Sequence, residues 1–95
     1  NVLIRKKQFS KALQSYRRAL ELQPNWAEPL NNLAWYLAQA EDASVRDPEE
    51  AVRLAERLCM LSGNENAVHL ETLGRAYASA GRIESALNTY NKALA

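Results

Sequence analysis

One pattern of apolar and small residues occurs twice in the chain and limits the folds that it can adopt. The two full copies are Phe9, Ala12, Leu13, Tyr16, Ala19, Leu20 and Ile83, Ala86, Leu87, Tyr90, Ala93, Leu94. A looser copy runs from Pro48 to Cys59 and includes Ala51. Each copy has the spacing of one face of an α-helix. Repetition of this kind is typical of proteins built from stacked units, each of which covers the apolar face of its neighbour.

A second helical pattern precedes two of these copies. Leu30, Leu33, Ala34 and Leu37 have the same spacing as Leu70, Leu73, Gly74 and Tyr77, and Leu3 is the remnant of this pattern in the first copy. Small residues such as Ala34 and Gly74 allow two helices to approach closely, while tyrosines and leucines fill the space beside the contact. No stretch alternates like a β-strand, so the pattern predicts an all-α fold of antiparallel helix pairs.

The expected helix ends follow from turn and cap chemistry. Pro24-Asn25 and Asp47-Pro48 offer caps or first-turn prolines, and Gly63-Asn64 and Gly81 are typical helix stops. We therefore expect helices near residues 1–7, 9–22, 26–40, 48–61, 66–79 and 82–94.

These features resemble the tetratricopeptide repeat family. Its marks are small residues at close helix contacts, a Tyr or Phe in the second helix, and a Pro after it, as Pro24 follows Tyr16. The segment from Leu30 to Trp35 also looks like the first helix of many bacterial members. The resemblance covers essentially all 95 residues and implies a short right-handed α-solenoid.

The repeats divide a single expected domain, residues 1–95, into three parts. We expect a partial first repeat over 1–24, a second over 25–65, and a third over 66–95 without a capping helix. Leu37 and Ala51 are 14 positions apart, whereas Tyr77 and Ala86 are 9 apart, which places a five-residue insertion within 41–47. The pattern indicates a fragment of a longer array with partly uncovered ends. We expect these ends to form a homodimer through Leu3, Phe9, Ala86, Leu87, Tyr90 and Leu94.

The resemblance implies a scaffold that binds an extended peptide segment of a partner protein. In the family, first helices line a concave groove, and amide side chains there can pair with a peptide backbone. Asn32 with Trp35 is the favoured pair; in the alternative reading, Asn31 and Asn32 are only solvated and Trp35 packs between layers. The candidate residues are Asn1, Arg5, Asn31, Asn32, Trp35, Gln39, Glu71, Thr72 and Arg75.

Two other functions stay open at this stage. The array could be a structural spacer or dimerisation module, or it could accompany an enzymatic or membrane domain in a longer chain. A chaperone-type carboxylate clamp is rejected, because Val68 and Thr72 stand where that clamp needs cations.

Charge and composition exclude several kinds of partner. Lys plus Arg number 12 against 11 Asp plus Glu, so no strong field favours nucleic acid. Arg17, Arg18, Arg53 and Arg57 could form a basic strip, but nearby glutamates favour a solvated, balanced face. No apolar run approaches the ~20 residues that a membrane-spanning helix needs. The single cysteine rules out an internal disulfide and mildly favours a reducing compartment such as the cytoplasm.

The residues also argue against an enzyme. Cys59 aligns with Leu20 and Leu94, which predicts a buried core position, and His69 is the sole histidine. Glu41-Asp42 and Glu49-Glu50 lie where capping and solubility explain them. There is no glycine-rich phosphate loop and no ligand spacing for zinc or calcium, so no cofactor is expected.

Overall fold

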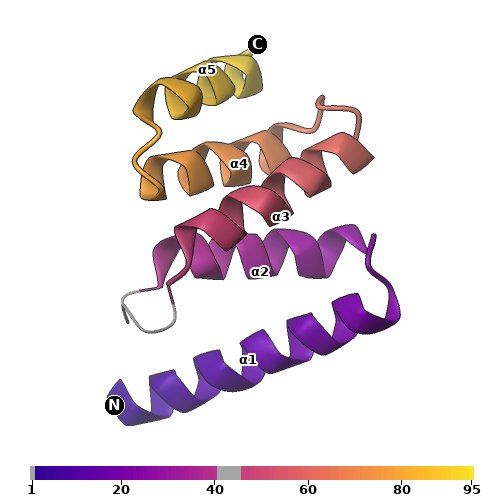
Figure 1. Ribbon diagram of the computed structural model, residues 1–95, viewed down its shortest axis with the longest axis vertical. Helices are drawn as coiled ribbons and strands as arrows, with labels where there is room; N and C mark the ends of the chain where they lie inside the picture. The colour runs from indigo at the N-terminus through magenta and orange to yellow at the C-terminus, as the bar shows by residue number, and fades with distance from the viewer. Residues whose placement is uncertain (1, 41–45) are drawn as a thin grey trace.

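The computed structural model describes residues 2–40 and 46–95, with side chains for all of these except 2–7 and 9. Within these ranges the chain forms five helices, stacked in chain order with alternating direction (Figure 1). They are α1 (Val2–Leu22), α2 (Ala27–Gln39), α3 (Pro48–Leu61), α4 (Ala67–Ser79) and α5 (Ile83–Leu94). No strand occurs in the described ranges, and the predicted all-α fold of stacked helix pairs is confirmed. The expected insertion lies mostly in residues 41–45, outside the described residues.

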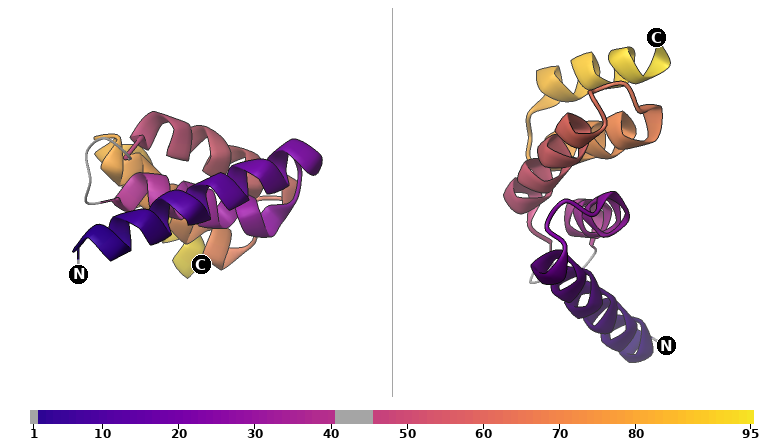
Figure 2. Two further views of the ribbon diagram at one scale, coloured as in Figure 1. Left: turned by 90° about the horizontal axis from the view of Figure 1, so that it is seen from below. Right: turned by 90° about the vertical axis from the view of Figure 1, so that its right-hand side faces the viewer.

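The first helix differs from the prediction. Two helices were expected, over 1–7 and 9–22, but α1 is continuous from Val2 to Leu22. The physical reason is that residues 2–22 contain no Gly or Pro, and straight-chain helix formers such as Lys7 and Gln8 occupy the expected break. α1 therefore extends away from the rest of the stack toward its N-terminus (Figure 2, right).

The remaining helix ends agree with the predicted chemistry, with one exception. Asp47 caps α3 by accepting a hydrogen bond from the Glu50 backbone N–H at 3.1 Å, and Pro48 occupies the first turn. After α3 and α4 the chain turns through positive φ angles at Gly63 (72°) and Gly81 (80°). The exception is Asn25, because Trp26 occupies the N-cap of α2 without a side-chain cap bond.

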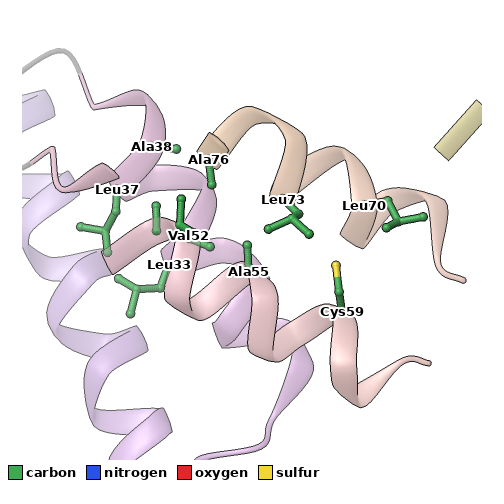
Figure 3. Packing of buried hydrophobic residues seen from close by; sticks show 11 residues of the cluster. Leu33, Leu37, Ala38, Val52, Ala55, Cys59, Leu70, Leu73 and Ala76 are labelled. Carbon is green, nitrogen blue, oxygen red and sulfur yellow. The ribbon is translucent and has the colours of Figure 1, made fainter. Parts of the chain in front are cut away.

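The core lies between α2, α3 and α4. Leucines from α2 and α4 surround a row of small residues on α3, as Figure 3 shows. Ala34, Ala51, Ala55 and Ala76 are completely buried, which is the close helix contact that the small-residue pattern predicts. A small residue also allows a close helix contact between α4 and α5, where a Cβ added to Gly74 would lie 2.6 Å from Cε1 of Tyr90.

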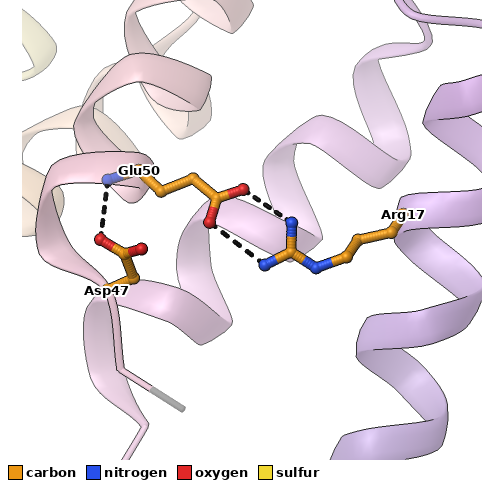
Figure 4. Close-up of polar contacts among 3 residues, drawn as sticks. All are labelled: Arg17, Asp47 and Glu50. Carbon is orange, nitrogen blue, oxygen red and sulfur yellow. Dashed lines mark hydrogen bonds and ion pairs between the residues drawn. The ribbon is translucent and has the colours of Figure 1, made fainter. Parts of the chain in front are cut away.

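Polar contacts tie α3 to the layers on both sides. Arg17 on α1 donates two hydrogen bonds to the Glu50 carboxylate, at 2.7 and 3.1 Å (Figure 4). Arg82 donates to Glu49 at 2.9 Å, and Arg57 donates to the side-chain oxygen of Asn25 at 2.6 Å. Because Arg17 and Arg57 have partners on neighbouring elements, these residues support a balanced surface rather than a free basic strip.

Candidate functional site

α2 and α4 lie side by side and run in the same direction, which places the first helices of two successive pairs on one face. Three contacts join them at successive turns. Thr72 Oγ1 donates to Asn31 Oδ1 at 2.6 Å. The Arg75 guanidinium lies 4.6 Å from the centre of the Trp35 ring. Ser79 Oγ donates to the Ala38 carbonyl at 2.7 Å. The two helices are therefore joined by one contact per helical turn.

The expectation that Thr72 lies open to a ligand is wrong. Thr72 is only 1% exposed, because its hydroxyl faces α2 and also donates to the Val68 carbonyl at 3.2 Å. The side chain of Asn31 is half-buried against it, so the reading of Asn31 as merely solvated is also wrong. The sequence did not reveal this contact because helical periodicity within α4 does not show which side of it faces α2.

Trp35 is half-buried on α2 and lies next to Arg75 of the following layer. Arg75 from the next layer covers one side of the indole, an interaction typically worth about 0.5–1 kcal/mol at exposed sites. Arg75 also approaches Glu71 at 3.5 Å, one helical turn earlier. Trp35 and Arg75 together therefore form a contact that bridges α2 and α4.

The other candidate residues fall into two groups. Asn32 is half-buried, and Gln39 and Glu71 are exposed, on the same side as Trp35 and Arg75. Asn1 lies outside the described residues, and the side chain of Arg5 is not among those described. We use the name α2–α4 face for the accessible set: Asn32, Trp35, Gln39, Glu71 and Arg75.

The residues that were expected at the exposed ends also differ in their exposure. Ala86 is 3% exposed, so it is not available to a second chain as expected. Tyr90 packs on Gly74 of α4 but is only half-buried. Leu87 and Leu94 are 58% and 86% exposed, and Ile83, which was not among the residues expected at an end, is 58% exposed. The side chains of Leu3 and Phe9 lie outside those described.

Cys59 and His69 meet without forming a nucleophile pair. Cys59 is buried, as predicted, and its thiol donates to the backbone carbonyl of His69 at 3.4 Å rather than to the ring. Burial raises the pKa of the Cys59 thiol, which keeps it protonated and unreactive. The His69 ring contacts the Ser62 hydroxyl at 3.1 Å, and burial lowers the pKa of this imidazole.

The described residues contain neither a candidate metal site nor a helix that could span a membrane. No group of three or more His, Cys, Asp or Glu side chains is placed to hold a metal ion there. Of the described helices, none is long and apolar enough to cross a membrane.

Comparison with known families agrees with the stacked helix pairs. The family description "Tetratricopeptide repeat" matches residues 1–25 and 70–95, which together are more than half of the chain. A comparison with curated proteins gave no significant match. Tetratricopeptide repeats are generally protein–protein interaction modules and are typically non-catalytic scaffolds. The regular helix pairs, the small residues at their contacts and this match establish that the chain belongs to the tetratricopeptide repeat family.

Proposed function

We propose that this chain binds an extended segment of a partner protein along the α2–α4 face. The observation that carries the proposal is the contact between Trp35 and Arg75, which joins two successive repeats into one surface. An extended peptide that crosses both helices would contact the exposed part of the indole without any rearrangement of the core. Preorganised aromatic and Arg side chains are also the residue types that contribute most to affinity in protein interfaces.

The polar residues of the face suit a peptide backbone. Asn32 and Gln39 lie one turn to either side of Trp35, and each amide offers a donor and an acceptor. Glu71 and Arg75 carry opposite charges, so the face has no strong preference for a charged partner. Backbone pairing with an apolar contact at Trp35 is therefore the recognition mode that this face supports best.

The buried contact between Asn31 and Thr72 has a supporting role in this proposal. It fixes α2 relative to α4 immediately beside Trp35, so the surface is formed before a partner arrives. Binding then costs less conformational entropy than it would on a flexible surface.

A peptide-display selection against the whole chain tests the proposal. Peptides selected by the wild-type chain should bind Asn32→Ala and Trp35→Ala at least about tenfold more weakly, which corresponds to about 1.4 kcal/mol. Arg53→Ala is the matched control, because Arg53 is exposed on α3. Circular dichroism checks that each variant stays folded. Selected peptides that bind Trp35→Ala normally and lose affinity for Arg53→Ala would place the binding surface elsewhere.

A further inference from the structure

Val68 is an exposed apolar residue at the start of α4 that continues the α2–α4 face. Its side chain is 60% exposed. Because successive helix residues are about 100° apart, Val68 lies roughly 40° from Thr72 and roughly 20° from Arg75 around the axis of α4. Thr72 faces α2, where its hydroxyl donates to Asn31. Arg75 lies over the Trp35 ring of the same helix. Val68 is therefore on the side of α4 that faces α2, and it remains accessible.

The separation of Val68 and Trp35 follows from the contact between the two helices. Asn31 and Thr72 lie at the same level, because their side-chain oxygens are 2.6 Å apart and α2 and α4 run in the same direction (Figure 1). Trp35 lies one turn after Asn31, and Val68 lies one turn before that level on α4. Each of these four-residue steps is about 6 Å along the helix axis, so the two side chains are about 12 Å apart along the face.

This separation matches a short stretch of extended chain. An extended segment advances about 3.1–3.4 Å per residue, so three or four residues span about 12 Å. Side chains lie on one side of the segment when they are three positions apart in a polyproline II conformation or four apart in a β-strand. One extended segment can therefore place one side chain on Trp35 and another on Val68.

We propose that the segment bound on the α2–α4 face carries two apolar side chains three or four positions apart, one on Trp35 and the other on Val68. This inference rests on the proposed function and specifies the class of segment that the face selects. A charged side chain at either position would lose water against an apolar partner, which disfavours it. Between the two positions lies Glu71, which approaches Arg75 at 3.5 Å, so the intervening part of the segment meets polar side chains.

Synthetic peptides that differ only in spacing test the inference. Each contains two leucines in a Ser- and Thr-rich sequence, and it is titrated into the whole isotope-labelled chain while NMR follows the Val68 amide and the Trp35 indole. Affinity should be highest when the leucines are three or four positions apart, by about tenfold over adjacent leucines. A maximum at seven positions, which is two helical turns, would mean that a helix binds and would overturn the inference. The absence of saturable shifts at millimolar peptide would also overturn it.

Two variants in the first turn of α4 assign the contact to Val68. Val68→Asp should weaken binding of the best peptide by about tenfold or more, because it places a charge in the apolar contact. Ala67→Asp is the matched control, since Ala67 is exposed in the same turn but lies roughly 140° from Thr72, away from α2. The helix dipole favours Asp at both positions, and circular dichroism checks that both variants are folded. Equal affinities of the two variants would contradict the assignment.

Failure of this inference is distinguishable from failure of the proposed function. If affinity falls in Trp35→Ala but depends neither on Val68 nor on the leucine spacing, the second apolar contact is wrong and binding on the α2–α4 face stands. Affinity that is unchanged in Trp35→Ala would refute both. If the Val68 amide shifts on dilution of the chain alone, the occupant is a second copy and the inference is wrong.

Discussion

Replacing Gly74 with alanine probes a close contact between α4 and α5. An added Cβ would lie 2.6 Å from Cε1 of Tyr90 and 2.9 Å from Cδ1 and Cζ. The ring must retreat by about 0.8 Å to bring the shortest distance to an ordinary 3.4 Å. Overpacking of this kind costs about 1–3 kcal/mol, and the better helix propensity of alanine offsets about 1 kcal/mol. We therefore expect Gly74→Ala to lower the free energy of unfolding by about 1 kcal/mol.

A double-mutant cycle separates the two opposing effects. In a Tyr90→Ala background the ring is absent, so the same Gly74→Ala change should raise the free energy of unfolding by up to about 1 kcal/mol. Urea denaturation followed by circular dichroism measures all four proteins. In a chain of this length, 1 kcal/mol also corresponds to a shift of about 4–8 °C in melting temperature. Equal effects of Gly74→Ala in the two backgrounds would refute the proposed contact between Gly74 and Tyr90.

Three further predictions concern contacts away from that pair. Glu50→Gln should lower the free energy of unfolding by less than about 1 kcal/mol, since Arg17 is about half exposed, and a salt titration should abolish the difference. Asn66→Ala should lower the free energy of unfolding, measured by urea denaturation, by about 1 kcal/mol, because Asn66 accepts hydrogen bonds from the backbone N–H groups of Val68 and His69. A change near zero would mean that water replaces this cap. The pKa of His69 is lower in the folded state, so between that lowered pKa and the ordinary pKa of about 6.5 the unfolded chain binds more protons. The free energy of unfolding should therefore fall as the pH drops through about 6.5, and a His69→Gln variant should show a weaker pH dependence of this free energy.

The helices away from the N-terminus were predictable because their signals are local. The starts of α3 and α4 agree with the prediction to within a residue, and Asp47, Gly63 and Gly81 act as expected at helix ends. Burial of Cys59 was also predictable, since its position in the repeat aligns with leucines. Such features depend on periodicity and cap chemistry, which a single sequence displays directly.

The errors concern relations between elements. The predicted break in α1 relied on the repeat alignment, whereas the local residues favour an uninterrupted helix. Thr72 appeared to face solvent because its neighbour α2 lies about forty residues away in sequence. Ala86 and Tyr90 were assigned to an exposed end, but they face α4 within their own helix pair. The binding role of the α2–α4 face stays a prediction, and the sequence did not show which residues hold α2 and α4 together.

The central claim is that a partner segment binds on the α2–α4 face, and the two tryptophans provide the most direct measurement. Trp35 lies on this face, whereas Trp26 is partly exposed at the start of α2 and serves as an internal control. A peptide selected by the chain is titrated while NMR follows the two indole N–H resonances. We expect a saturable shift of the Trp35 resonance with little change at Trp26. A binding peptide that leaves the Trp35 resonance unmoved would contradict it.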